Sequence, residues 1–555
     1  MEKLKQIIVD KVFDSKNIRK ISENSSLVKK ENQWMMDFKS VSMSEEFLSL
    51  FVEEFDKAFI GKKVQVGGME SGAIPLIVAL RLKSETVCNS FYVRKSRKKS
   101  DMSNFYEGEI LKSVPIVLVD DVLNTGATFL KQEKILNDEG HSVNFIFSVI
   151  RFRDEKYYKE ILEKNIDIIS IFELSNFKNE LGTENILDIN NKLSIPKDKF
   201  KVVWGKKLTE YYDNNFYTII PKSGIVLDED SIYTGCDDGS FYSVSKSDGS
   251  MNWKYKIKFG VKGKNIFSTP AQSEKYVFFG AYDGNLYCLD KKDGKVIWVF
   301  FDADYIGASP WVENNKYVYI GLEFGFINKK GGVAKIEIKT GKKVWCNYEM
   351  SGLTHASPVS NVKLNIVVCG CNDNFVYCFD RKSGELLWKY KTEGEVKYGC
   401  VFDEKRKLVI IAGMDGGVYL INVKTGELYH KFEAMFGFYS NPVIKDDTLY
   451  IGSLDKRVYA FDIKNKVVKW EHKTGGRIFA SPTIFDNSLF IGSNDGNLYE
   501  LDLVSGKEIS ITIFSERIVN KIIAVKENNK NILYVKTFLN QLYKMEENKN
   551  LKPFK

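Results

Sequence analysis

The stretch PIVLVDDVLNTGATFL, residues 115–130, decides the fold of the first part of the chain. It opens with an unbroken run of branched and leucine side chains, residues 116–119, which is typical of a parallel strand covered on both faces. Asp120 and Asp121 follow at the carboxyl end of that strand, where open α/β sheets place their ligands. The polar stretch behind them, which ends in a glycine, predicts a helix over residues 128–140.

The residues after this strand can bind a sugar phosphate. Two acceptor-only carboxylates can take hydrogen bonds from a ribose diol. Small polar residues then offer backbone N–H groups and hydroxyls to a phosphate at the start of the helix; they are Asn124, Thr125, Gly126, Ala127 and Thr128. An isolated Asp-Asp pair would more often be a solvated strand end, so the whole string VLVDDVLNTGAT carries the prediction.

This string resembles the phosphoribosyl-diphosphate motif of type I phosphoribosyltransferases, in which two acidic residues precede a threonine- and glycine-containing phosphate loop. The resemblance implies an α/β domain, with a parallel sheet and flanking helices, that binds 5-phosphoribosyl 1-diphosphate. Asp120 and Asp121 would then be catalytic residues that orient the ribose. They would hold Mg²⁺ indirectly, through substrate and water.

Two further segments agree with that family and follow its order. VGGMESGAIP, residues 66–75, resembles the diphosphate loop, with Glu70, Ser71 and Gly72 as binding residues. The segment FYVRK, residues 91–95, opens a polar stretch rich in lysine.

In orotate phosphoribosyltransferases the corresponding Arg-Lys pair and a later lysine lie in a loop that closes over the diphosphate. By this resemblance Arg94 would be a diphosphate-binding residue, and Lys95 and Lys98 would be catalytic. A solvated basic loop is the alternative interpretation of this cluster.

The acceptor substrate is less well defined than the diphosphate. FRDE, residues 152–155, resembles the segment that supplies an arginine to the base, which makes Arg153 the candidate. Ser100 and Asp101 stand where the orotate subfamily has a His-Gly pair, and its Leu-Lys-Ser-Gly element has no clear copy in residues 26–37. The resemblance therefore implies phosphoribosyl-diphosphate binding and leaves the acceptor unidentified.

A repeat of about forty to forty-five residues fills the rest of the chain. Copies such as GAYDGNLY and GSNDGNLY end in a tyrosine or its equivalent, namely Tyr242, Tyr287, Tyr377, Tyr419, Tyr459, Tyr499 and Tyr543. A degenerate copy places Ala334 at the tyrosine position, which brings the number of units to eight. Most units have a tryptophan eleven residues further on. Four short strands in such a period predict a β-propeller, here with eight blades.

The units resemble pyrroloquinoline-quinone-type repeats, which form propellers of the WD40-like kind, over residues 200–550. In that family glycine and tryptophan of neighbouring blades pack together. The chain lacks the adjacent-cysteine pair of the dehydrogenases that hold the quinone, so we expect no such cofactor. The resemblance instead implies a scaffold that recognises a protein partner.

The domain boundaries follow from these motifs. We expect a phosphoribosyltransferase-like domain over residues 1–182, a linker over 183–215 and the propeller over 216–555. KFKVVWG, residues 199–205, resembles the tryptophan strands that end other blades. We therefore expect residues 200–204 to pair with the last blade and close the ring.

Composition sets outer bounds on the function. The chain has 555 residues, a net charge of +8, eight scattered cysteines and only four histidines. A histidine-based metal site or catalytic triad is therefore not expected, and nucleic-acid binding is not indicated. There is no apolar run of membrane-spanning length and no signal segment, so we expect a soluble cytoplasmic protein without a membrane partner.

Two functional hypotheses remain. The first is a Mg²⁺-dependent phosphoribosyltransferase of nucleotide metabolism, whose propeller recruits a partner or gates the site. The second is a sensor or interaction protein, in a stress or defence pathway, that binds phosphoribosyl diphosphate or a nucleotide without turnover. Retained Arg94, Lys95 and Lys98 favour the enzyme. Because members of the orotate type exchange the closing loop across a two-fold axis, the resemblance also implies a homodimer through the first domain.

Overall fold

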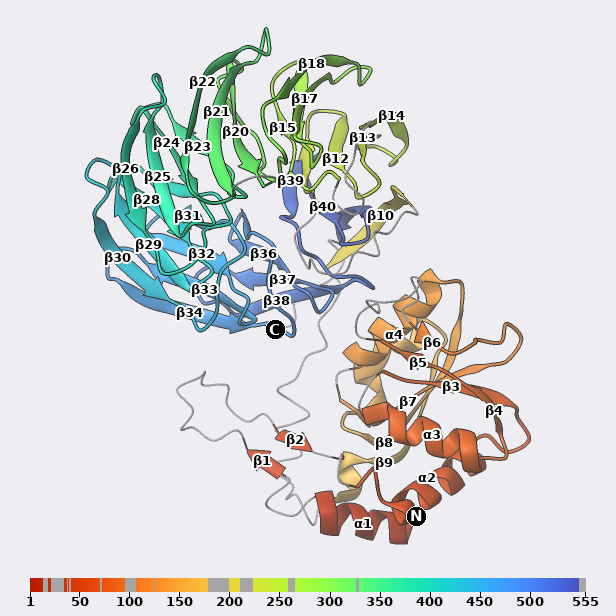
Figure 1. Ribbon diagram of the computed structural model, residues 1–555. Helices are drawn as coiled ribbons and strands as arrows, with labels where there is room; N and C mark the ends of the chain where they lie inside the picture. The colour runs from red at the N-terminus through yellow and green to blue at the C-terminus, as the bar shows by residue number, and fades with distance from the viewer. Residues whose placement is uncertain are drawn as a thin grey trace. The chain divides into compact units, whose positions relative to one another are not determined.

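The computed structural model describes residues 1–12, 18–20, 34–36, 38, 41–69, 72–94, 106–124, 126–177, 199–209, 223–257, 265–325 and 329–548. The chain forms two compact units, Met1–Pro196 and Lys197–Lys555 (Figure 1). Among the helices of the described segments, none is long and apolar enough to cross a membrane.

The first unit is built on a five-stranded sheet in the order β4-β3-β7-β8-β9, in which all neighbours are parallel. Its strands are β3 (Val64–Gly67), β4 (Val87–Ser90), β7 (Ile116–Leu123), β8 (Val143–Arg151) and β9 (Asp167–Glu173). The helices are α1 (Glu2–Val12), α2 (Glu45–Ala58), α3 (Ala73–Lys83), α4 (Ala127–Asp138) and α5 (Lys159–Leu162), with 3₁₀ turns η2 (Glu155–Tyr158) and η3 (Leu174–Phe177). Two small antiparallel pairs complete it, β1 (Ile18–Lys20) with β2 (Trp34–Met36) and β5 (Tyr92–Val93) with β6 (Tyr106–Glu107). The predicted α/β class is confirmed.

Strand β7 is longer than its apolar run suggests. The strand continues through both aspartates to Leu123 because β8 pairs with it along its length, with Asp120 opposite Ser148 and Leu123 opposite Arg151. Helix α4 follows closely and ends two residues before Gly140, which has a left-handed φ of +83°.

Phenylalanines anchor the helices to this sheet. Phe51 and Phe55 of α2 meet Phe147 of β8 edge-on, with ring centroids 5.8 and 4.9 Å apart. Phe59 contacts Phe145 in the same way at 5.3 Å. These buried rings fix the sheet whose carboxyl edge carries the candidate site.

The second unit consists of eight four-stranded antiparallel sheets, which confirms the predicted eight-bladed propeller. Blades 1 to 3 comprise β11 (Ile225–Leu227), β12 (Ser231–Gly235), β13 (Ser240–Ser245), β14 (Met251–Lys256); β15 (Ala271–Gln272), β16 (Tyr276–Gly280), β17 (Asn285–Asp290), β18 (Val296–Phe301); and β19 (Trp311–Glu313), β20 (Tyr317–Phe324), β21 (Lys330–Glu337), β22 (Lys343–Met350). Blades 4 to 6 comprise β23 (Val359–Asn361), β24 (Ile366–Gly370), β25 (Phe375–Asp380), β26 (Leu386–Lys391); β27 (Val401–Asp403), β28 (Leu408–Ala412), β29 (Gly417–Asn422), β30 (Leu428–Glu433); and β31 (Val443–Lys445), β32 (Thr448–Gly452), β33 (Arg457–Asp462), β34 (Val467–Lys473). Blade 7 comprises β35 (Thr483–Phe485), β36 (Ser488–Gly492), β37 (Asn497–Asp502) and β38 (Glu508–Ile513).

Blade 8 joins the two ends of the unit. Its order is β10-β41-β40-β39, in which β10 (Phe200–Lys207) is the outer strand and the last strands of the chain, β39 (Ile523–Glu527), β40 (Lys530–Lys536) and β41 (Gln541–Glu547), supply the rest. In Figure 1 the yellow strand β10 lies beside the blue strands of this blade. Phe200 pairs with Glu547 and Gly205 with Tyr543, so the predicted closing strand is confirmed.

Tryptophan and glycine interlock neighbouring blades, as the repeat family implies. The outer-strand tryptophan of one blade covers a left-handed glycine of the next, in the pairs Trp204–Gly249, Trp253–Gly294, Trp298–Gly341, Trp345–Gly384, Trp388–Gly426 and Trp470–Gly506. A Cβ atom at any of these glycines would lie within 3 Å of the ring. Where His430 replaces the tryptophan, Lys466 replaces the glycine and keeps φ at +60°.

The Asp-Gly turns have a second role beyond chain reversal. In six blades the repeat tyrosine donates a hydrogen bond from its hydroxyl to the aspartate four residues earlier, as Tyr377 does to Asp373 at 2.7 Å and Tyr499 does to Asp495 at 2.6 Å. Burial raises the pKa of these tyrosines, so the hydroxyl stays a donor. The D-G-x-x-Y pattern is therefore structural.

Candidate functional site

Two adjacent parallel strands bring the predicted diphosphate loop and the two aspartates together. Strand β3 pairs with β7 in parallel, with Gly67 opposite Leu118, so both strands end at the same edge of the sheet. Beyond β3, a methyl group at Gly68 would lie 2.5 Å from the carbonyl oxygen of Val119. Glycine therefore lets the loop backbone rest directly on β7.

The start of α3 faces both carboxylates. A methyl group at Gly72, which precedes α3, would lie 3.2 Å from Oδ1 of Asp120 and 3.4 Å from Oδ2 of Asp121. Both aspartates are partly exposed, and Oδ1 of Asp120 accepts a hydrogen bond from the backbone N–H of Asp121 at 3.0 Å. Two elements about fifty residues apart in sequence thus form one anionic edge beside a helix N-terminus.

A tight turn leads from β7 into α4. Gly126 has a left-handed φ of +78° and precedes the helix, while its neighbour Thr128 is exposed. The hydroxyl of Tyr158 donates to the carbonyls of Leu123 and Asn124, each at 3.0 Å. Burial raises the pKa of Tyr158, which keeps this hydroxyl protonated and the turn fixed. Sequence reasoning missed Tyr158, because only the fold brings η2 against the turn.

Arg94 directly precedes the predicted closing loop, and its side chain already has partners. Its guanidinium donates a hydrogen bond to the carboxylate of Glu107 and forms an ion pair with it across the β5–β6 hairpin. It also donates to the hydroxyl of Tyr92 at 3.0 Å. The hairpin lies beside the diphosphate loop, since the N–H of Val93 donates to the carbonyl of Gly68 at 2.8 Å.

Arg153 is buried and keeps its hydrogen-bonding capacity unused. Its side chain is 2% exposed, and none of its three guanidinium nitrogens has a hydrogen-bond partner. Burial lowers its pKa, while the guanidinium carbon lies 5.8 Å from the ring centroid of Tyr157. The nearby Tyr158 donates to the turn after β7, where the side-chain oxygen of Asn124 is likewise buried without a partner.

Several predicted site residues lie outside the described residues, namely Glu70, Ser71, Lys95, Lys98 and Thr125, as does the side chain of Ala127. Their roles stay predictions. Within the segments that the structure describes, no group of three or more His, Cys, Asp or Glu side chains could hold a metal ion by itself. The indirect role predicted for Asp120 and Asp121 does not require such a group.

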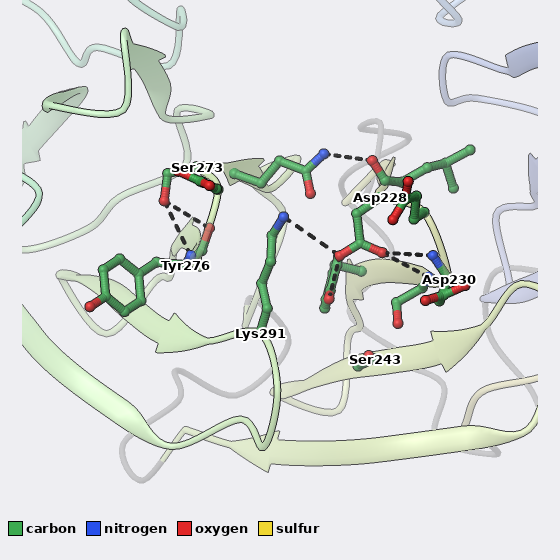
Figure 2. A network of polar contacts seen from close by, with 12 residues as sticks. Asp228, Asp230, Ser243, Ser273, Tyr276 and Lys291 are labelled. Atoms are coloured by element: carbon green, nitrogen blue, oxygen red, sulfur yellow. Dashed lines mark hydrogen bonds and ion pairs between the residues drawn. The ribbon is translucent and has the colours of Figure 1, made fainter.

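The propeller carries a polar groove between blades 1 and 2, with a volume of about 880 Å³. Figure 2 shows the contacts at its wall, where Lys291 lies 3.5 Å from Oδ2 of Asp228. The same carboxylate accepts a hydrogen bond from the hydroxyl of Tyr233 at 2.8 Å, and Asp228 also caps the turn through the N–H of Ser231. These charges satisfy one another and join two blades, so the network is structural.

Comparison with known proteins identifies each unit. The orotate phosphoribosyltransferase of Methanocaldococcus jannaschii is 28% identical over 142 residues, which are 26% of this chain and 79% of that protein. The enzyme of the same name from Pyrococcus furiosus is 30% identical over 138 residues, 24% of this chain and 74% of that protein.

The second unit matches the family model described as outer membrane protein assembly factor BamB over residues 198–370 and 372–539. The crystal structure of BamB from Moraxella catarrhalis superposes with a TM-score of 0.50 at 18% identity, covering 64% of this chain and 99% of that one. That likeness shows the fold. The chain therefore belongs to the orotate phosphoribosyltransferase family through its first unit and to the BamB repeat family through its second.

Proposed function

We propose that the first unit is a Mg²⁺-dependent phosphoribosyltransferase that binds 5-phosphoribosyl 1-diphosphate and transfers phosphoribose to an acceptor with an anionic group. The proposal depends on the approach of Gly72 to Asp120 and Asp121, because it joins the two predicted binding elements in one site. The relatives named orotate phosphoribosyltransferase support the same reaction class.

Each residue of the site has a separate proposed role in such a transfer. Asp120 and Asp121 orient the ribose, and the turn at Gly126 receives the 5-phosphate at the N-terminus of α4. Bound Mg²⁺ would neutralise the leaving diphosphate while keeping several waters. An oxocarbenium-like transition state then needs placement more than a protein nucleophile. Lys95 and Lys98 are proposed to close over the diphosphate.

Arg153 supports an anionic acceptor. A buried guanidinium without hydrogen-bond partners is costly, and an anionic ligand would remove that cost. A planar base with a carboxylate fits both the charge and the neighbouring ring of Tyr157. Orotate is the first such acceptor to test. Ser100 and Asp101 depart from the orotate pattern, so the test includes other bases.

The ion pair of Arg94 with Glu107 favours a second candidate, a sensor that binds phosphoribosyl diphosphate without turnover. An arginine expected to neutralise the diphosphate is here already neutralised by a carboxylate. In both candidates the propeller is proposed to recognise a protein partner.

The proposed homodimer has a surface on α3. The part of this helix before its basic last turn, AIPLIVAL, is apolar on all sides, and Ile74, Val78 and Leu82 form an exposed stripe at i, i+4 and i+8. A second copy of the unit is proposed to cover it. Light scattering of the full chain tests this, and Val78→Glu should convert a dimer to a monomer.

The decisive experiment measures diphosphate release from phosphoribosyl diphosphate and Mg²⁺ with a panel of bases. Asp120→Asn and Asp121→Asn should each weaken phosphoribosyl-diphosphate binding by about 1.5–3 kcal/mol in calorimetry, since an amide satisfies the ribose hydroxyls less well. Exposed Asp138 on α4 supplies the control, Asp138→Asn.

The acceptor is tested separately. Arg153→Met should raise the KM of the acceptor and leave phosphoribosyl-diphosphate affinity unchanged, whereas exposed Arg81→Met should change neither. Binding without turnover would select the sensor. Absence of phosphoribosyl-diphosphate binding to the wild-type chain would refute both candidates.

A further inference from the structure

Three polar side chains lie on one face of the hairpin that β5 and β6 form. Tyr92 pairs with Glu107 across the two strands, and Arg94 follows Tyr92 by two residues, so all three project to the same side. Nη2 of Arg94 donates to Oε1 of Glu107 and, at 3.0 Å, to the hydroxyl of Tyr92. A hydrogen bond with Glu107 raises the pKa of Tyr92. We call Tyr92, Arg94 and Glu107 the hairpin triad.

The hairpin is fixed against the predicted diphosphate loop. Val93 forms a parallel bridge with Met69. A methyl group at Gly67 would lie 2.3 Å from the ring of Phe91, so only glycine lets the two segments approach this closely. Arg94 is therefore held next to a residue that pairs directly with the loop, and its side chain is positioned by the hairpin triad.

The triad does not use the full hydrogen-bonding capacity of Arg94. The carboxylate of Glu107 contacts Nη2, while Nε of Arg94 is buried and has no partner among the residues that the structure describes. A guanidinium binds a carboxylate or a phosphate most strongly when two of its N–H groups meet two oxygens side by side. The contact with Glu107 therefore leaves a donor that another oxyanion could use.

Arg94 can exchange its partner but cannot lose its charge. Burial lowers the pKa of Arg94, but the hydrogen bond and the charge of Glu107 more than offset this effect, so the pKa is raised overall. The side chain of Arg94 is 19% exposed and that of Glu107 is 37% exposed. Water and dissolved anions can therefore reach the ion pair, and an ion pair of this kind is only moderately stable.

We propose that Glu107 is an internal competitor for Arg94, which the diphosphate group of phosphoribosyl diphosphate must displace. The diphosphate offers several oxygens to Nη2 and to the unused Nε, which a single carboxylate contact does not. When the diphosphate leaves, Glu107 takes the arginine back, so the guanidinium is not left without an opposing charge. The carboxylate thus lowers the affinity for ligands that carry a diphosphate and speeds their release. The inference rests on the proposed function and holds for both the enzyme and the sensor.

The test is calorimetric titration of the full chain, in the presence of Mg²⁺, with phosphoribosyl diphosphate, with inorganic diphosphate and with ribose 5-phosphate. Glu107→Gln removes the competing charge, so phosphoribosyl diphosphate and diphosphate should each bind at least about fivefold more tightly. Ribose 5-phosphate carries no diphosphate, so its affinity should stay the same. Glu109→Gln is the matched control, because it removes the same charge from an exposed residue two positions away and should change no affinity.

A double variant shows whether the effect passes through Arg94. In an Arg94→Met background, Glu107→Gln should no longer change the affinity for phosphoribosyl diphosphate, since the group for which it competes is absent. A general effect of net charge would persist in that background. Stopped-flow measurement with the single variant Glu107→Gln should show slower dissociation of diphosphate, by about the same fivefold factor as the gain in affinity.

Binding that follows this order of variants and ligands supports the proposal. It is overturned if phosphoribosyl diphosphate binds the wild type and Glu107→Gln with equal affinity, or if ribose 5-phosphate gains as much affinity as diphosphate. In both cases the proposed function stands, because the wild type still binds phosphoribosyl diphosphate, whereas absence of binding to every variant would overturn both. Should Glu107→Gln fail to fold, Glu107→Asp withdraws the carboxylate from Arg94, and the same order of affinities is expected.

Discussion

Replacing Gly384 by alanine should lower the free energy of unfolding of the propeller by more than backbone strain alone would. Gly384 has a φ of +77°, which costs a non-glycine residue about 1–2 kcal/mol. Its new Cβ would also lie 2.5 Å from Cδ2 of Trp345, and overpacking of this kind costs about 1–3 kcal/mol. Together these give a loss of about 2–5 kcal/mol.

The two contributions can be separated. Gly140 has a similar φ of +83° with no atom near its missing Cβ, so Gly140→Ala should cost only about 1–2 kcal/mol. Between blades 5 and 6 the chain has His430 and Lys466 in place of the tryptophan and the glycine. His430→Trp alone should therefore destabilise the propeller, and adding Lys466→Gly should restore its stability. The second comparison isolates the interlock between ring and glycine.

Urea unfolding of the full chain is the appropriate assay, followed by tryptophan fluorescence for the propeller and by far-ultraviolet circular dichroism for the first unit, which contains the described helices and Gly140. Seven of the eight tryptophans lie in the second unit, so the signal reports mainly on the propeller. The reasoning is refuted if Gly384→Ala costs no more than Gly140→Ala, or if His430→Trp is equally stable with and without Lys466→Gly.

Gly72→Ala should weaken phosphoribosyl-diphosphate binding about tenfold in calorimetry, because its Cβ would displace the carboxylates by a few tenths of an ångström; unchanged affinity would contradict the shared site. Deleting residues 1–210 removes β10 and should leave an unstable, aggregation-prone propeller, whereas deleting 1–190 should not; equal melting temperatures would show that β10 adds nothing to the stability of the propeller. Burial raises the pKa of Cys371 to about 12, so about 10⁻⁴ of its thiol is ionised at pH 8. Cys371 should resist a disulfide reagent at pH 8 and react only as the pH approaches 12 or the chain unfolds; labelling of Cys371 within minutes in the native state would show that its burial is incomplete.

The repeats made the second unit predictable in detail. A fixed period with tyrosine, glycine and tryptophan at set places defines each blade, and even the displaced strand at residues 200–204 is recognisable by its Val-Val-Trp pattern. The missing tryptophan at Ser510 has a topological reason. The adjacent blade 8 has a chain break where the others have the glycine turn, so a ring there would have no glycine to cover.

The first unit was predictable where local sequence sets the geometry. Parallel pairing of β3 and β7 explains why Gly72 and the aspartates meet, and this could be inferred from their positions after two strands. The ion pair of Arg94 with Glu107 could not, since nothing in the sequence marks residues thirteen apart as partners in a hairpin. Likewise the burial of Arg153 could not be inferred, because it lies in the charged segment FRDE, which alone suggests an exposed turn.

The composite blade 8 also determines the order of events during synthesis. Strand β10 emerges from the ribosome directly after the first unit, but its partner β41 follows about 330 residues later. At typical rates of translation this is a delay of about half a minute. During that time the first unit can fold and bind ligands, while β10 presents an unpaired strand edge. A nascent chain would therefore complete the candidate site of its first unit well before its propeller, and chaperones that cover exposed strands should be most needed in that interval.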